Sequence, residues 1–158
     1  MSNKRAFLFV ATFVAASSGA VTAQTPDQQR CSASDPDLSI RGCTAIIQTG
    51  GETVRNLATA HFYRGLAYAA KGQLDHAIED WNQTIQLDPS DAIAVGNRGL
   101  AYANEGQLDH AIDDYNHAID LKQDYAEAFF NRGMAHDLQG LSDLAIEDYN
   151  QAIRLNPN

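Results

Sequence analysis

Small and apolar residues recur at helical spacing along most of the chain. One run covers residues 60–71 and ends at Gly72, a residue type that readily adopts the left-handed conformation closing a helix. A second run follows and stops at the Leu-Asp-Pro sequence of residues 87–89, and Asp75 stands where its N-cap is expected. Its apolar positions are Ala77, Ile78, Trp81 and Ile85. The pattern therefore predicts two helices joined by a tight turn.

The pair of runs recurs with a fixed period of 34 residues. Arg64-Gly65 returns as Arg98-Gly99 and Arg132-Gly133, and the segment GQLDHAI is unchanged between its first two occurrences, at 72–78 and 106–112. Such self-similarity predicts a repeat protein. The expected units are 58–91, 92–125 and 126–158. The expected N-caps of the second helices are Asp75, Asp109 and Asp143.

The small residues of each unit predict close packing of its two helices. Gly65 and Ala77 let the two backbones approach, while Tyr68 and Trp81 fill the space beside them. One helix pair cannot bury its apolar face alone, so neighbouring pairs are expected to stack.

These units resemble the tetratricopeptide repeat, whose pattern has Gly at unit position 8, Tyr at 11, Ala at 20, an aromatic residue at 24 and Pro at 32. The corresponding residues are Gly65, Tyr68, Ala77, Trp81 and Pro89, then Gly99, Tyr102, Ala111, Tyr115 and Gln123, then Gly133, His136, Ala145, Tyr149 and Pro157. His61 and Val95 stand where the family favours Trp. The resemblance implies an all-α fold, a short right-handed α-solenoid of antiparallel helix pairs with three full repeats and an N-terminal partial repeat.

The sequence before the first full unit resembles the second helix of a repeat unit. Residues 36–49 are expected to form a degenerate capping helix in which Cys43 falls at the aromatic position, and Gly50-Gly51 make the turn within the segment 36–57. The preceding segment, 24–35, contains Cys31.

Residues 1–23 have the order of an export signal. Two basic residues precede an apolar run of eleven, Ala6–Ala16, which is too short to span a membrane, and Val21-Thr22-Ala23 suits a signal peptidase. The alternative is a hydrophobic N-terminal helix that stays attached. We expect an exported, periplasmic or secreted protein.

Charge narrows the classes of partner. The chain has a formal net charge of −9, which becomes −11 over 135 residues if the signal with its two basic residues is removed. Such acidity argues against nucleic acid and against an anionic membrane surface. An apolar content of 44% with 20% charged residues argues against a disordered tail.

Export makes the two cysteines interpretable. Cys31 and Cys43 are the only pair, and an oxidising compartment favours a structural disulfide between them. A redox site usually has C-x-x-C spacing, and zinc needs more ligands.

Arginine and aspartate recur together in every unit. A ladder of arginines is one way to bind an acidic ligand, but each has an aspartate at matched spacing on the neighbouring helix, which favours structural ion pairs. The expected pairs are Arg64 with Asp80, Arg98 with Asp114, and Arg132 with Asp148.

Candidate chemistry is sparse. His110, Asp114 and His117 share a helix face, but the first unit has Gln83 in place of His117, so a solvated face is favoured over a metal site. The chain has no nucleophile elbow and no glycine-rich phosphate loop. We expect no enzyme activity, no metal and no cofactor.

The resemblance implies that the first helices line a concave groove for a peptide or protein segment. The expected groove residues are Phe62, Tyr63, Leu66, Ile93, Gly96, Asn97, Leu100, Asn104, Phe130, Asn131 and Met134. Gly96 is expected to leave a gap for a ligand side chain, and Asn97 and Asn131 to bond a peptide backbone. Family members that grip a C-terminal carboxylate use Lys, Asn and Arg here, and only Asn97 fits, so binding of chaperone tails is not expected.

The last unit is followed by no polar covering helix in this sequence. Ile146, Tyr149 and Ile153 are therefore expected to stay partly exposed, as a site for self-association or a partner. The sequence predicts a non-catalytic interaction module of the bacterial cell envelope, with a secretory-pathway origin elsewhere as an alternative. A structural subunit that self-associates through this end is the second hypothesis.

Overall fold

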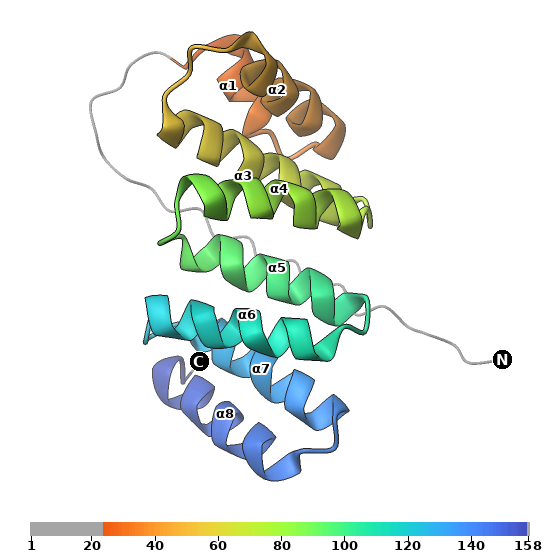
Figure 1. Ribbon diagram of the computed structural model, residues 1–158, viewed down its shortest axis with the longest axis vertical. Helices are drawn as coiled ribbons and strands as arrows, with labels where there is room; N and C mark the ends of the chain where they lie inside the picture. Colours follow the sequence, from red (N-terminus) through yellow and green to blue (C-terminus); the bar gives the residue numbers. More distant parts are fainter. Residues whose placement is uncertain (1–23, 158) are drawn as a thin grey trace, which may run out of the picture.

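The computed structural model describes residues 24–157, and within them every regular element is an α-helix (Figure 1). The proposed export signal lies outside the described residues. The elements are α1 (Pro26–Cys31), α2 (Pro36–Thr49), α3 (Val54–Ala70), α4 (Leu74–Leu87), α5 (Ala92–Asn104), α6 (Leu108–Leu121), α7 (Ala126–Leu138) and α8 (Ser142–Leu155).

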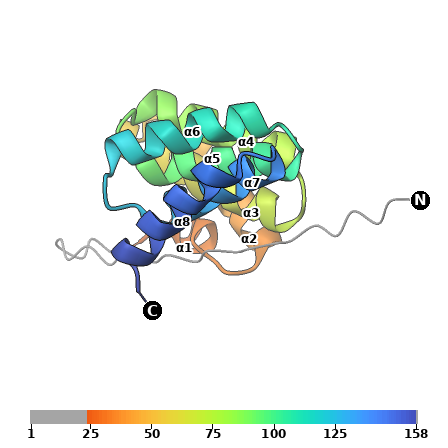
Figure 2. The same cartoon turned by 90° about the horizontal axis from the view of Figure 1, so that it is seen from below.

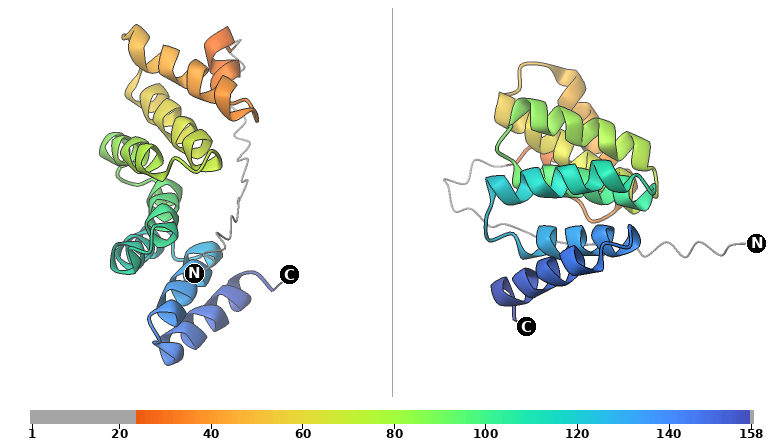
Figure 3. Two further views of the ribbon diagram at one scale, coloured as in Figure 1. Left: turned by 90° about the vertical axis from the view of Figure 1, so that its right-hand side faces the viewer. Right: turned by 60° about the horizontal axis from the view of Figure 1, so that its bottom comes forward.

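The helices form antiparallel pairs that stack into a right-handed solenoid, which confirms the predicted fold (Figure 1). The full pairs are α3 with α4, α5 with α6, and α7 with α8, and each second helix packs on the first helix of the next pair. Because α5 also touches α7, the first helices line the inner side of the curve, while α4 and α6 lie outside (Figure 3, left). Viewed from below, α8 ends the stack nearest the viewer (Figure 2).

Glycines end the first helices as predicted, but the aspartates are not N-caps. Gly72, Gly106 and Gly140 have φ of 72°, 78° and 78°. After each left-handed glycine only one residue precedes the next helix, so the N-cap positions fall on Gln73, Gln107 and Leu141, none of which makes a side-chain cap bond. The three predicted caps, Asp75, Asp109 and Asp143, lie in the first turn, where a carboxylate still favours the positive end of the helix dipole.

Glycine–aromatic contacts bring the helices of each full pair together. A Cβ added at Gly65 would lie 2.8 Å from Trp81 Nε1, one at Gly99 3.0 Å from Tyr115 Cε1, and one at Gly133 2.9 Å from Tyr149 Cε1. Any larger residue at these glycines would push the aromatic ring out of the interface between the two helices. The packing glycine of each pair is therefore in closer contact with the aromatic residue of the second helix than with the alanine proposed from sequence.

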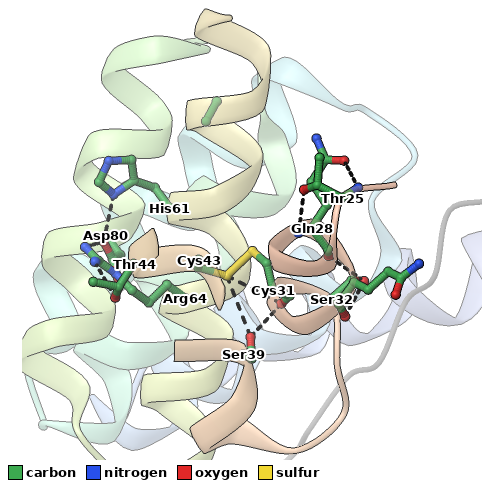
Figure 4. Close-up of a disulfide and its surroundings, with 12 residues drawn as sticks. Thr25, Gln28, Cys31, Ser32, Ser39, Cys43, Thr44, His61, Arg64 and Asp80 are labelled. Carbon is green, nitrogen blue, oxygen red and sulfur yellow. Dashed lines mark hydrogen bonds and ion pairs between the residues drawn. A yellow bond between two sulfur atoms is a disulfide. The ribbon is translucent and has the colours of Figure 1, made fainter. Parts of the chain in front are cut away.

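The N-terminal partial repeat replaces this contact with a covalent bond. Cys43 is the eighth residue of α2, as Trp81 is of α4, and it forms a disulfide with Cys31 of α1 (Figure 4). The preceding residue is Gly42, where a Cβ would lie 2.5 Å from the backbone nitrogen of Cys31. The glycine therefore sits on the second helix here, and α1 presses directly on it.

Two features of the N-terminal region differ from expectation. The segment 24–35 contains α1, which begins with a capping box between Thr25 and Gln28 and a proline at its first turn, a sequence signal that was overlooked. The first full helix begins at Val54, earlier than residue 60, because Thr53 caps it. At 17 residues, α3 is four longer than α5, which is one extra turn.

Candidate functional site

Three arginine–aspartate pairs run along the stack, one in each full repeat. Each guanidinium donates through Nε and Nη2 to both oxygens of one carboxylate: Arg64 to Asp80 at 2.8 and 2.8 Å, Arg98 to Asp114 at 2.8 and 2.6 Å, and Arg132 to Asp148 at 2.9 and 2.5 Å. The three carboxylates are buried. The arginines are therefore held as structural partners and are not free to bind an acidic ligand.

The third nitrogen of each guanidinium joins neighbouring repeats. Arg98 Nη1 donates to Asn82 Oδ1 of the preceding second helix at 2.6 Å, and Arg132 Nη1 donates to Asn116 Oδ1 at the same distance. Arg64 Nη1 reaches Thr44 Oγ1 at 3.1 Å (Figure 4). This joint was not foreseen, although asparagine follows the aromatic position in all three full repeats.

Histidine joins the outer two of these pairs. His61 Nδ1 lies 2.8 Å from Asp80 Oδ1, and His136 Nδ1 lies 3.0 Å from Asp148 Oδ2. His61 occupies the position where the family favours Trp, so a polar contact replaces an apolar one.

These contacts set the charge state of the first cluster. Burial by itself would raise the pKa of Asp80, but hydrogen bonds from His61 and Arg64, with the charge of Arg64, outweigh it and hold that pKa below its ordinary value. The bond to Asp80 likewise raises the pKa of Arg64. The stabilisation by this cluster is thus fully present above pH of about 4 and is lost as the pH falls through the lowered pKa of Asp80.

The predicted groove residues lie on α3, α5 and α7, but they differ in exposure. Tyr63 and Phe130 are 36% and 44% exposed. Phe62 and Leu66 pack against the core around Trp81 instead. The other partly buried predicted residues are Ile93, Asn97, Leu100, Asn131 and Met134, and Asn104 is exposed.

The gap expected at Gly96 is closed. Gly96 is buried, and a Cβ there would lie 3.1 Å from Tyr125 Cε1 and 3.2 Å from its hydroxyl oxygen. Tyr125 comes from the turn before α7 and packs with Val95 and Ala128. Burial raises the pKa of its hydroxyl to about 12. The prediction of a ligand pocket at Gly96 was wrong. It took account only of side chains on the first helices, whereas the space beside Gly96 is filled by Tyr125 from the turn between two units.

The histidine face proposed as a metal alternative does not converge. Asp114 points to Arg98, whereas the ring of His110 packs on Tyr102 with 5.2 Å between centroids. No group of three or more possible metal ligands occurs within residues 24–157. Within the same range, no helix has the length and apolar character needed to cross a membrane.

The outer face of α8 is open. Ile146 and Ile153 are 57% and 62% exposed, and a shallow hollow beside them is lined by Glu147, Asn150, Ile153 and Arg154. Tyr149, the third residue predicted for this surface, packs against Gly133, and its ring centroid lies 5.6 Å from that of Phe130. Three more exposed leucines gather around the last turn: Leu138, Leu141 and Leu144.

Sequence comparison agrees with this architecture. Family models described as "TPR repeat" match residues 65–106 and 99–140, and one described as "Tetratricopeptide repeat" matches 126–158. The chain belongs to the tetratricopeptide repeat family. No curated protein matches it in sequence.

Solved structures of other tetratricopeptide repeat proteins share the fold. The second repeat domain of Spaghetti (RPAP3) bound to the HSP90 peptide SRMEEVD is 29% identical, with a TM-score of 0.61, over 63% of this chain and 92% of that one. The second domain of human RPAP3 with the HSP70 peptide SGPTIEEVD is 28% identical, with a TM-score of 0.64, over 67% and 88%. YrrB, a protein with an unusual peptide-binding site, is 21% identical, with a TM-score of 0.68, over 78% and 61%.

Tetratricopeptide repeat proteins are in general non-catalytic interaction modules, and this chain is one of them. The residues at the family's carboxylate-clamp positions are Phe62, Leu66, Asn97, Glu127 and Asn131. They supply no cation, and Glu127 is an exposed anion.

Proposed function

We propose that the protein is an exported interaction module that binds a peptide or protein segment on the concave face of α3, α5 and α7. The observation that carries the proposal is the pairing of exposed rings with accessible amides along this face. Tyr63 and Phe130 offer apolar area at its two ends, and Asn97 and Asn131 lie between and beside them.

The amides suit an extended backbone. An asparagine side chain both donates and accepts, so it can satisfy a peptide N–H and C=O together. The two amides are one repeat apart on successive first helices and hold no hydrogen bond to another side chain within residues 24–157. They are therefore available to a ligand, whereas the arginines of the same helices are not.

The ligand proposed is neutral or basic. The related domains of RPAP3 bind peptides ending in EEVD. Here the clamp positions lack cations, Glu127 adds a negative charge, and the chain as a whole is acidic. Repulsion of an acidic tail follows from these charges.

Selection from a displayed library of random 12-residue peptides tests this function. Peptides recovered on the wild type are expected to bind Tyr63→Ala and Asn97→Ala about tenfold more weakly, because each change removes one ligand contact. Gln83→Ala, at an exposed site on α4, is the matched control and should bind as the wild type does. Equal affinity for all four proteins would contradict binding on this face. Enrichment of acidic C-terminal peptides would contradict the proposed ligand charge.

We also propose an oxidising, exported location in the bacterial cell envelope. The support is the order of residues 1–23 together with the disulfide between Cys31 and Cys43. N-terminal sequencing of protein recovered from the periplasm or medium is expected to begin at Gln24. Recovery only from cytoplasm, with Met1 or Ser2 at the N-terminus, would contradict export.

A second candidate function is that of a structural subunit that self-associates through its last repeat. The exposed Ile146 and Ile153 favour it, since isolated apolar faces of this kind mark interaction sites. Tyr149 is mostly engaged within its own repeat and contributes less than the two isoleucines.

A further inference from the structure

The outer face of α8 carries the same residues that form the joints inside the stack. Inside, Ile78, Asn82 and Ile85 of α4 meet the next pair: both isoleucines pack into its core, and the asparagine accepts from Arg98. The equivalent set on α8 is Ile146, Asn150 and Ile153, all exposed. This face is thus built as half of a helix–helix joint.

One residue of α8 departs from the earlier units and adds a positive charge to this face. Arg154 stands where the first two units have Gln86 and Asp120. The two joints between full repeats place a guanidinium against the asparagine of the second helix, and here the second helix itself carries a guanidinium. Arg154 Nη2 donates to Gln151 Oε1 but has no ion-pair partner within residues 24–157.

Opposite charges flank the hollow seven residues apart. Glu147 and Arg154 line it together with Asn150 and Ile153, and Glu147 also lacks an ion-pair partner among the described residues. Seven residues are two turns, so both side chains lie on one side of the isoleucine stripe. A second α8 that runs antiparallel about an axis near Asn150 places its Arg154 against Glu147 and its Glu147 against Arg154.

We propose that two copies of the chain associate through α8 in this two-fold antiparallel manner. The proposal rests on the self-association named as the second candidate function and assigns it a geometry. Ile146 and Ile153 of both copies form the apolar centre, and the two Glu147–Arg154 pairs close its edges. The surface is self-complementary, as a two-fold interface requires.

Sedimentation equilibrium on the purified protein and its charge variants tests the geometry. In a dimer of Glu147→Arg, each introduced arginine faces Arg154 of the other copy, and in a dimer of Arg154→Glu, each introduced glutamate faces Glu147 of the other copy. Because the two-fold axis places such a like-charged pair at both edges, each variant alone is expected to dimerise at least about tenfold more weakly. An equimolar mixture of the two variants restores both attractive pairs and should dimerise as the wild type does. Asp113→Arg, the position equivalent to Glu147 on α6, makes the same change of charge away from the interface and should have no effect.

The outcomes separate the geometry from self-association itself. Weak dimerisation of each charge variant by itself, with wild-type dimerisation in their equimolar mixture, supports the two-fold arrangement. A dimer weakened by Ile153→Asp but indifferent to both charge variants overturns the arrangement and leaves self-association standing. A wild type that stays monomeric at hundreds of micromolar overturns both. Peptide binding to the concave face is measured separately and is affected by none of these results.

Discussion

The two ends of the stack begin from the same helix pattern and are finished in different ways. At the N-terminal end, α1 lies over α2 and is joined to it by the Cys31–Cys43 disulfide, with both sulfurs buried. At the C-terminal end, α8 leaves Ile146 and Ile153 open, and Arg154 stands beside them. The N-terminal helix α2 is thus covered by α1, whereas the outer face of α8 leaves two isoleucines exposed.

The N-terminal closure shows what a very short helix needs. The six residues of α1 are too few to be stable by themselves or to bury much area. Two features compensate: the covalent bond and the close approach that Gly42 allows. The disulfide-linked α1 thus covers α2 with only six residues, whereas α8 presents exposed hydrophobic residues.

Among the changes that test this difference between the two ends, removal of the disulfide is expected to have the largest effect on stability. Cys31→Ser with Cys43→Ser should lower the free energy of unfolding by roughly 3 kcal/mol, because the closed loop no longer restricts the unfolded chain. Urea denaturation measures the change. Reduction of the wild type should reproduce it and leave the double variant unaffected. An unchanged midpoint would show that the disulfide contributes nothing to the stability of the stack.

Substitution of alanine for the packing glycine at each end compares the two directly. Gly42→Ala drives a methyl group into the backbone of α1 and should cost about 2 kcal/mol. Gly133→Ala meets the ring of Tyr149, which is partly exposed and has room to move outward, so its cost should be smaller and partly offset by better helix propensity. Equal losses in urea would refute the difference in rigidity between the ends.

The smallest effect concerns the amides of the joints. Asn116→Ala removes the acceptor of Arg132 and should cost about 1 kcal/mol, whereas Asn150→Ala, at the open end, should be neutral in the monomer. Thermal denaturation at low micromolar concentration measures both. A substantial loss for Asn150→Ala at that dilution would mean that its amide has a partner within the chain.

The repeat architecture was predictable because its signals are local and periodic. Spaced glycines and aromatic residues identified the helix pairs and their partners, and matched arginine and aspartate spacing indicated which side chains meet. The floor of the concave face was less predictable. Tyr125 reaches Gly96 from a turn between repeats, a contact that depends on the relative position of two units and not on the pattern within either. The N-caps were wrong for a similar reason, since the geometry of the left-handed glycine decides where the next helix begins.

The arginine joint has a consequence for how such a chain changes length. The guanidinium of each of the three arginine–aspartate pairs meets the residue after the aromatic position of the preceding unit, which is Thr44, Asn82 or Asn116. Excision of one whole 34-residue unit would bring Arg132 to Asn82 with the same geometry. Duplication would likewise insert a unit that already fits both neighbours, and the identical segments at 72–78 and 106–112 show how closely two units agree in sequence. The contact that fixes neighbouring repeats thus also makes them interchangeable.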